Sequence, residues 1–330
     1  MSILVTGGAG YIGSHTVAEL ISRGEQVVVV DNLQQGHRAA LLDAPFYQVD
    51  IRDNQRLSEI IQQHKVESVI HFAANSLVGE SVKDPLKYYH NNVSATAQLL
   101  STLVQNHVHK IVFSSTAAVY GEPATVPITE DTPSNPTNPY GETKAAIERM
   151  LSWCHQAYGL NSVSLRYFNA AGAHQSLPIG ENHNPETHLI PLILQVALGQ
   201  REATQIFGTD YPTEDGTCLR DYIHVMDLAS AHWLAVQHLR RNAGCEVFNL
   251  GNGAGFSVRQ VVEVARQVTG HPIPTIETPR RAGDPAILVA SAEKARKVLQ
   301  WEPRLTDLET IVASAWSWHH SHPYGYVVVG

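Results

Sequence analysis

The sequence predicts an α/β fold, a doubly wound parallel sheet that carries a smaller C-terminal α/β lobe. Short β-branched runs alternate with amphipathic helical patterns up to about residue 170, and a glycine-rich turn directly follows the first run. Parallel neighbours need long crossover connections, and the crossovers here have a helical pattern. Beyond residue 170 the spacing becomes irregular, and 330 residues are too many for one compact core. Two lobes are therefore expected.

The strands of the sheet are expected where β-branched residues cluster between turn signals. These runs are residues 3–5, 27–30, 46–49, 68–72, 111–113 and 163–167. The later chain shows a helical pattern at 189–198, a strand pattern at 246–250 that is expected to return to the main sheet, and an amphipathic helix at 258–269.

Composition narrows the class of partner. The formal charge of -8 contains no long like-charge block, so the chain has no basic footprint for nucleic acid or anionic lipid. No apolar run approaches the length of a membrane span, and a small-molecule partner is favoured. The three cysteines show neither a disulfide framework nor metal-type spacing, which fits the cytoplasm. They are Cys154, Cys218 and Cys245.

The turn after the first strand predicts a dinucleotide cofactor. Glycines at 7, 8, 10 and 13 permit a tight turn, bring the backbone against a pyrophosphate and let the following helix pack closely, as in Rossmann-type folds. Asp31 ends the second strand, where it can accept hydrogen bonds from ribose hydroxyls and repel a 2′-phosphate. The cofactor is therefore expected to be NAD rather than NADP. Residues 1–170 are expected to form the NAD-binding domain, with about 215–255 returning to its sheet, and residues 171–330 are expected to form most of the substrate lobe.

A second constellation predicts the chemistry. Pro139 begins a helical pattern that places Tyr140 and Lys144 four residues apart on one face. A free phenol has a pKa of ~10, so Tyr140 needs nearby positive charge, from Lys144 and an oxidised nicotinamide ring, to act as a base. The fifth strand ends at 114–116, where a hydroxyl can meet the same substrate oxygen.

These motifs resemble the extended short-chain dehydrogenase/reductase superfamily and, within it, the UDP-glucose 4-epimerases. The resemblance spans nearly the whole chain, and its two more specific blocks are Arg220-Asp221-Tyr222-Ile223-His224-Val225 and Arg280-Arg281-Ala282-Gly283-Asp284. The other matching blocks are 6–13, 71–74, 78–81, 140–144, 166–169 and 216–217.

The resemblance implies that UDP-galactose and UDP-glucose are interconverted by inversion at C4. Tyr140 would remove the 4-hydroxyl proton while hydride passes to a tightly bound NAD. The resulting 4-keto sugar would turn over and take the hydride back on its other face. Lys144 would tune Tyr140 and bind the nicotinamide ribose. Thr116 would hydrogen-bond the 4-oxygen.

The resemblance also implies two sets of binding residues. Residues expected to contact NAD are Gly7, Gly10, Tyr11, Ile12, Gly13, Asp31, Asn32, Asp50, Ile51, Phe72, Ala73, Ala74, Asn92, Ser114, Tyr140, Lys144 and Phe168. Residues expected to hold the UDP-sugar are Thr116, Tyr140, Asn169, Leu189, Phe207, Arg220, Arg281 and Asp284. Arginines suit this set because a diphosphate needs fixed cationic donors.

Two departures from the family pattern leave details open. Many members have Leu-Lys where this chain has Asn75-Ser76, so a cationic contact to NAD from that loop is absent. The position that sets sugar size falls at Leu288, or at Ile287 if the alignment slips, which leaves the acceptance of N-acetylated sugars undecided. Three histidines near the C-terminus are more typical of a solvated helix end than of ligands, and no metal is expected. These are His319, His320 and His322.

Three alternatives to epimerisation make different demands on the sequence. A nucleotide-sugar 4,6-dehydratase generally has Asp-Glu after the strand-end Thr, whereas Ala117-Ala118 follow Thr116 here. A silent NAD-sensing regulator commonly loses the Tyr or the Lys, and both are present. A reductase would release its cofactor in each cycle.

Two apolar helical stripes indicate a further interface. They lie in the predicted helices at about 85–107 and 141–158, and part of each covers the sheet. The resemblance implies that the same helices pair with those of a second subunit in a four-helix bundle, which makes a homodimer.

Overall fold

A seven-stranded parallel sheet forms the centre of the computed structural model, which describes residues 1–281 and 284–326. The spatial order of its strands is β11-β6-β5-β4-β1-β2-β3, and every neighbouring pair is parallel. The predicted fold class is confirmed, and each strand overlaps a predicted run. The strands are β1 (Ser2–Thr6), β2 (Val27–Asp31), β3 (Phe46–Gln48), β4 (Val66–His71), β5 (Lys110–Thr116), β6 (Asn161–Tyr167) and β11 (Cys245–Leu250).

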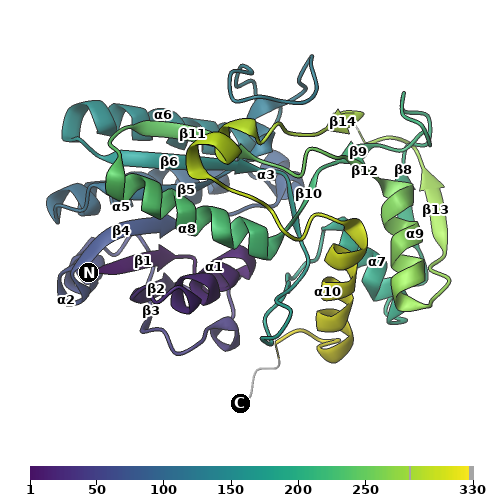
Figure 1. Ribbon diagram of the computed structural model, residues 1–330, viewed down its shortest axis with the longest axis horizontal. Helices are drawn as coiled ribbons and strands as arrows, with labels where there is room; N and C mark the ends of the chain where they lie inside the picture. The colour runs from purple at the N-terminus through teal and green to yellow at the C-terminus, as the bar shows by residue number, and fades with distance from the viewer. Residues whose placement is uncertain (282–283, 327–330) are drawn as a thin grey trace.

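Helices cover both faces of this sheet (Figure 1). Successive side chains of a strand point to opposite faces, so Ile3 and Val5 pack in one buried cluster and Leu4 packs in the other. Strands buried on both sides are continuously apolar, as the sequence of β1 and β2 shows. One face carries α1 (Tyr11–Ser22) and α8 (Val225–Arg241); the other carries α2 (Asn54–His64), α5 (Ala95–Gln105) and α6 (Pro139–Tyr158).

The strand order reverses beside β1, and this reversal positions the site. The chain leaves β1 toward β2 on one side, whereas β4 lies on the other side of β1. The N–H groups of Phe72 and Ala73 donate to the Thr6 carbonyl, so the segments after β1 and β4 lie side by side. Ligands of open α/β sheets bind at such a switch point, outside the carboxyl ends of the strands.

The helix predicted at about 85–107 is divided in the structure. A π-helical segment, η2 (Tyr89–Ser94), separates α4 (Pro85–Tyr88) from α5, and π-turns inside helices often occur at functional sites. Asp84 caps α4 through the Lys87 N–H. Three shorter segments complete this lobe: α3 (Val78–Lys83) and the 3-10 helices η1 (Arg38–Ala40) and η3 (Ala117–Tyr120).

The smaller lobe has its own core. Figure 1 shows α7, α9 and α10 gathered on the right, away from the main sheet, and their buried faces share one cluster. The helices are α7 (Leu189–Ala197), α9 (Val258–Thr269) and α10 (Leu308–Ser321), with η4 (Ala295–Leu299) closer to the main sheet. The helices predicted at 189–198 and 258–269 are thus confirmed. The division into domains near residue 170 stays a prediction.

Seven short strands form three small sheets that the sequence did not predict. They contain two to four residues each, too few for periodicity to reveal. The pairs are β7 (Asn169–Ala171) with β10 (Tyr222–His224), β8 (Thr204–Phe207) with β13 (Thr275–Thr278), and β9 (Leu219–Arg220) between β12 (Phe256–Ser257) and β14 (Ile287–Leu288).

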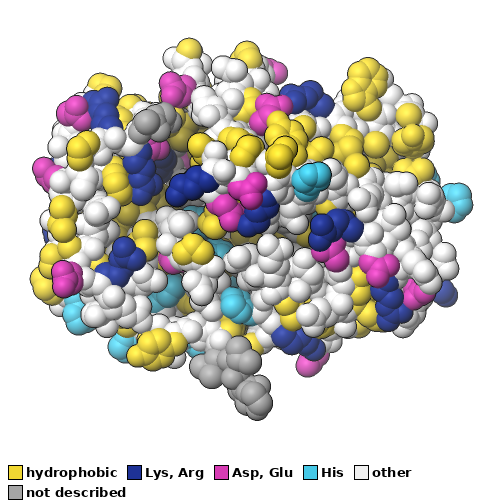
Figure 2. All heavy atoms as spheres, turned by 180° about the vertical axis from the view of Figure 1, so that it is seen from behind, with side chains coloured by type: hydrophobic (Ala, Val, Ile, Leu, Met, Phe, Trp, Pro, Cys, Tyr) yellow, Lys and Arg dark blue, Asp and Glu magenta, His cyan; other side chains and the backbone are white. Residues whose placement is uncertain are grey.

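The surface shows the mixed charge that the sequence, without long like-charge blocks, predicts. Figure 2 shows basic and acidic side chains intermixed over one face of the molecule. No helix among the described residues has the length and apolar character needed to cross a membrane.

A buried histidine predicts acid sensitivity. His71 lies 2.7 Å from the Thr6 hydroxyl and 2.9 Å from the Thr96 hydroxyl. Burial, with a smaller contribution from Lys144, lowers the pKa of His71 to about 3. The unfolded chain binds this proton near pH ~6.5, so the free energy of unfolding falls as the pH drops below that value, by up to ~1.4 kcal/mol per pH unit.

We expect His71→Gln to flatten this dependence. The thermal unfolding midpoint of the variant should change less between about pH 6.5 and about pH 4.5 than that of the parent chain. Exposed His320 gives a matched control, and His320→Gln should leave the slope unchanged. Equal slopes for His71→Gln and the parent chain would contradict the assignment.

Candidate active site

A cavity of about 490 Å³ opens at the switch point of the sheet, a size typical of small-ligand sites. Segments far apart in the sequence meet in its wall, including the turn after β1, the end of β5, the start of α6 and the loop before α7. Most of the predicted site residues line it. They are Gly7, Gly10, Tyr11, Ile12, Gly13, Asp31, Asn32, Asp50, Ile51, Phe72, Ala73, Ala74, Ser114, Thr116, Tyr140, Lys144, Phe168, Asn169 and Leu189.

The glycine turn forms the floor of the cavity and requires glycine at two positions in particular. Gly7 has a φ of +72°, and a Cβ there would lie 2.6 Å from the Ala73 backbone nitrogen. A Cβ on Gly13 would lie 2.2 Å from the Gly7 carbonyl oxygen. The turn therefore brings the N-terminus of α1 close to the cavity, where free N–H groups and the helix dipole favour an anion.

Asp31 closes the cofactor end of the cavity. Its Oδ2 accepts the Ala9 N–H at 2.9 Å, and its Oδ1 accepts the Leu33 N–H at 2.8 Å. Burial raises the pKa of Asp31, and these two N–H donors oppose that rise. Each carboxylate oxygen keeps a further lone pair, so the residue fits a pair of ribose hydroxyls, and the cradle as a whole fits NAD.

Asn32 and Asp50 lie together at the rim. The Asn32 amide donates to Asp50 Oδ2 at 3.2 Å, and Arg52 holds the same carboxylate through two hydrogen bonds of 2.7 Å. The Arg52 hydrogen bond holds the pKa of Asp50 at about 2, although partial burial opposes it. Asp50 is therefore a fixed, ionised acceptor at this end of the cavity.

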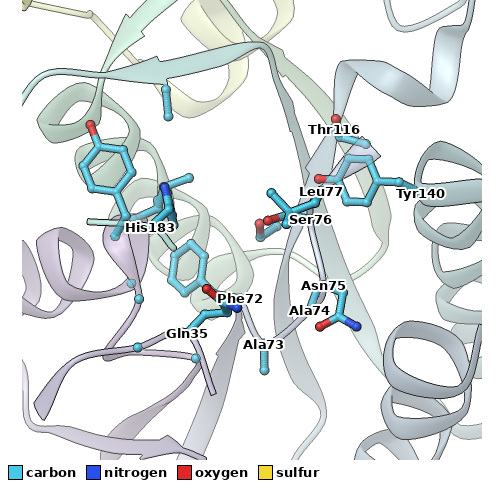
Figure 3. Close-up of a pocket in the computed structure, with 18 of the residues that line it drawn as sticks. Gln35, Phe72, Ala73, Ala74, Asn75, Ser76, Leu77, Thr116, Tyr140 and His183 are labelled. Atoms are coloured by element: carbon cyan, nitrogen blue, oxygen red, sulfur yellow. The ribbon is translucent and has the colours of Figure 1, made fainter. Parts of the chain in front are cut away.

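The catalytic constellation predicted from the sequence comes together at the other end. Asn138 caps α6 by accepting the Gly141 N–H, and Pro139 fixes its first turn. Figure 3 shows Tyr140 and Thr116 close together on one side of the cavity, across from His183. The Lys144 ammonium donates to the Ser114 carbonyl at 2.8 Å and lies 5.9 Å from the centre of the Tyr140 ring.

The pKa values here differ from the simple expectation that Lys144 activates Tyr140. Burial raises the pKa of Tyr140 to about 12, and its hydrogen bond with Thr116 lowers it only in part. Burial also lowers the pKa of Lys144 to about 7, against the attraction of Glu148. Because both groups are desolvated, the charge on Lys144 alone does not make this phenol a base.

Five predicted site residues do not line this cavity. Asn92 is fully buried behind its wall, where its amide bonds both backbone groups of Asn75 and the Thr143 hydroxyl. It positions the loop after β4 and faces no open space. The other four lie in the smaller lobe, and they are Phe207, Arg220, Arg281 and Asp284.

Those four residues form two pairs. The Arg281 guanidinium lies 3.8 Å from the centre of the Phe207 ring. Arg220 donates to Asp284 Oδ1 at 3.0 Å and to two backbone carbonyls at 2.9 Å. Both cations are thus held in fixed orientations by β8, β9 and the segment after β13.

The structure distinguishes between the two candidates for the sugar-size position. Leu288 packs with Phe168 on the buried cluster that contains Ala117. Ile287 precedes it on β14 and so projects to the opposite face of the strand. Leu288 therefore packs beside Phe168, which lines the cavity, although Leu288 itself does not line it.

Several residues that line the cavity were not predicted. Gln34 and Gln35 follow Asp31, and Tyr167 ends β6 with its hydroxyl 2.5 Å from that of Ser114. The rule that carboxyl ends of parallel strands meet at the site could have found Tyr167. His183 and His188 also line the cavity. No sequence pattern around these two histidines predicts that they lie at the edge of the main sheet.

Comparison with known proteins identifies the family of the chain. The model of the NAD dependent epimerase/dehydratase family matches residues 3–251. A protein of Halalkalibacterium halodurans named UDP-glucose 4-epimerase is 64% identical over 326 residues, which cover 99% of this chain and 98% of that protein. The chain belongs to the NAD-dependent epimerase/dehydratase family. A UDP-glucose 4-epimerase of Streptococcus mutans, 55% identical with 99% of both chains covered, supports the same group, so the predicted resemblance is confirmed.

Solved structures agree with the fold of this epimerase. A crystal structure of a UDP-glucose 4-epimerase has a TM-score of 0.97 at 55% identity and covers 99% of this chain and 100% of its own. The enzyme of Brucella ovis in complex with NAD has a TM-score of 0.94 at 46% identity, with 96% and 97% covered. The enzyme of Bifidobacterium longum in complex with NAD+ and UDP has a TM-score of 0.94 at 41% identity, with 99% and 100% covered. NAD is the cofactor of this family.

Proposed function

We propose that this epimerase interconverts UDP-galactose and UDP-glucose by inversion at C4 through a transient 4-keto sugar. One observation carries the proposal. Tyr140 and Thr116 share one side of a cavity that also contains Lys144 and the glycine turn, and no acidic pair follows Thr116. One acid/base group that takes and later returns the same proton suits epimerisation, whereas elimination requires a further acid and base. The names of the full-length relatives support the same reaction.

The residues of the chain have separate roles in this proposal. The glycine turn and Asp31 would hold NAD, which when bound would supply a hydride acceptor and donor for C4. Tyr140 takes the proton of the 4-hydroxyl and gives it back, while the Thr116 hydroxyl hydrogen-bonds the same oxygen. Lys144 binds the nicotinamide ribose, and its charge adds to that of the oxidised ring in stabilising the Tyr140 phenolate.

The UDP-sugar is assigned to the space between the cavity and the smaller lobe. Asn169 and Leu189 line the cavity, and Arg220 and Arg281 supply fixed cations of the kind that bind a diphosphate. Phe207 and Asp284, which orient these two arginines, complete the set. A complex of the Bifidobacterium longum relative with UDP supports a nucleotide site in this family.

A panel of UDP-sugars assayed for 4-epimer formation tests the proposal. UDP-galactose should give UDP-glucose without added NAD, because the hydride is reused in each turnover. A stable 4-keto-6-deoxy product would identify a dehydratase. Complete absence of nucleotide in the protein purified without added NAD would indicate a reductase that releases its cofactor.

We also propose a cytoplasmic homodimer. Large apolar side chains on α4, η2 and α6 are exposed although these segments contact one another. Hydrophobic side chains gather at the upper right of Figure 2, on the side where α6 lies. An exposed apolar patch of this kind indicates a protein interface. Its members include Leu86 (68% exposed), Tyr89 (40%), Trp153 (68%) and Tyr158 (57%).

The dimer is tested by placing charge on this face. Leu86→Glu combined with Trp153→Glu should convert the dimer to a monomer in sedimentation experiments, because a buried interface does not tolerate unpaired carboxylates. Ile276 is 53% exposed on β13 in the other lobe, so Ile276→Glu provides the control and should stay dimeric. A parent chain that sediments as a monomer at micromolar concentration would exclude the homodimer.

A further inference from the structure

Two carboxylates and two imidazoles converge in the loop between β7 and α7. They belong to Glu181, His183, Glu186 and His188, and one ligand atom from each lies within 4.8 Å of all the others. This Glu-x-His-x-x-Glu-x-His spacing is a different set from the C-terminal histidines His319, His320 and His322. A metal ion at these four residues would depart from the expectation that the chain binds no metal.

Three of the four nitrogen–oxygen distances suit a tetrahedral ion. Four ligands at the ~2.0–2.1 Å typical of zinc with nitrogen and oxygen donors lie roughly 3.3–3.4 Å apart. His183 Nδ1 lies 3.2 Å from Glu181 Oε1 and 3.6 Å from Glu186 Oε2, and His188 Nδ1 lies 3.7 Å from Glu186 Oε1. His188 Nδ1 also contacts Glu181 Oε1 closely. Both Nδ1 atoms thus face both carboxylates.

One of these atoms makes no hydrogen bond within the described part of the chain. His183 Nδ1 is buried and makes no hydrogen bond among the described residues, although it lies near two carboxylates. A buried nitrogen in that position is costly unless something binds it. Two carboxylates and two neutral imidazoles carry a charge of about -2, which one divalent cation balances.

We propose that Glu181, His183, Glu186 and His188 bind one divalent transition-metal ion, with zinc as the favoured ion because it prefers tetrahedral nitrogen and oxygen ligands. Imidazole and carboxylate donors without thiolates suit zinc and its neighbours in the first transition row. Four protein ligands leave no open position, so the site is structural and not catalytic.

The surroundings of the four ligands resemble a prepared outer shell. Glu186 Oε1 accepts the N–H groups of Thr187 and His188 at 2.7 and 2.8 Å, which fixes its carboxylate. Trp318 donates its indole N–H to the Glu181 backbone carbonyl at 2.9 Å, which fixes the main chain from which this ligand extends. Such partners orient metal ligands and raise affinity.

The ion would stabilise one wall of the active-site cavity. His183 and His188 line that wall beside Leu189, and the His183 ring lies edge-on to Tyr11, 6.2 Å between centres. Tyr11 belongs to the cofactor turn, so the ion would link the loop before α7 to the NAD end of the site. His183 lies across the cavity from Tyr140 (Figure 3), which is consistent with a structural role.

Metal binding to the full-length holoenzyme tests this inference. Protein purified without chelators should contain about one zinc per chain by elemental analysis. After chelator treatment, added Co²⁺ should give the visible absorption of a four-coordinate ion, and added Zn²⁺ should raise the thermal unfolding midpoint.

The variants compare a ligand with a matched non-ligand. His183→Ala and Glu181→Gln should each weaken Zn²⁺ binding by at least ~10-fold in a competition titration, since even loss of an outer partner has that effect. His320→Ala removes an exposed histidine outside the cluster and should leave binding unchanged. If His183→Ala does not fold, the nearly isosteric Glu181→Gln decides.

Two results would overturn the inference. The treated parent chain could bind neither Zn²⁺ nor Co²⁺, which would identify the cluster as an ion-free set of histidine–carboxylate contacts. Alternatively, both ligand variants could bind zinc as tightly as His320→Ala. Neither result would touch the proposed epimerisation, because conversion of UDP-galactose is measured separately.

Discussion

Tyr140→Phe should lower kcat for UDP-galactose epimerisation by about 10²–10⁴-fold while NAD remains bound. The proposed mechanism assigns the acid/base role to this phenol, which shares its side of the cavity with the Thr116 hydroxyl. Phenylalanine keeps the buried ring, so the cavity wall and the packing of α6 should persist. Steady-state rates, together with the nucleotide released on denaturation, measure both effects.

A tyrosine outside the cavity provides the control. Tyr47 on β3 bonds His64 and does not line the site, so Tyr47→Phe should retain full turnover. Unchanged turnover in Tyr140→Phe would exclude the proposed mechanism. Loss of NAD together with turnover would instead assign Tyr140 to cofactor binding.

Glu148→Gln should reduce the free energy of unfolding by about 3–5 kcal/mol. Glu148 on α6 accepts Arg166 Nε at 2.9 Å, and both side chains are only 9% exposed. Arg166 also donates to the Tyr120 hydroxyl, which in turn donates to Asn249 on β11. Neutralising Glu148 leaves the buried guanidinium without its counter-charge, and denaturant unfolding at fixed NAD concentration measures the loss.

The same helix offers a matched exposed pair. Glu142 bonds Arg149 at 2.7 Å, with side chains 38% and 58% exposed. Glu142→Gln should change the free energy of unfolding by less than about 1 kcal/mol, because solvent screens exposed pairs. Similar losses for the two variants would show that burial does not govern the Arg166–Glu148 pair.

The main sheet could be predicted from the sequence because its strands are locally encoded. Ser2–Thr6 and Val27–Asp31 are buried on both faces, so their apolar runs stand out between helical patterns. The small sheets could not be found in this way. Leu219–Arg220 pairs with two segments that follow it by more than thirty residues, and two residues carry no period.

The candidate site also combines residues that a local motif predicts with residues whose position depends on tertiary packing. Gly7, Asp31 and Tyr140 each belong to a short motif whose residue types have a physical reason, so the sequence predicts all three. In the structure they line one cavity. The expected contact of Asn92 with NAD stays a prediction, because its amide bonds Asn75 and Thr143 and the residue does not line the cavity. Which face a polar side chain presents depends on packing that a motif does not record.

Sequence alone determined the fold class and the choice of NAD, and it predicted Tyr140, Lys144 and Thr116 as the catalytic residues, since each of these inferences depends on neighbours along the chain. Tertiary structure decided what burial does to them. It raises the pKa of Tyr140 to about 12 and lowers that of Lys144 to about 7. It also placed His183 and His188, from the loop before α7, in the cavity wall, with His183 opposite Tyr140. The desolvation of these side chains and the meeting of distant residues in one cavity wall depend on which elements pack together. These contacts form only in the folded chain.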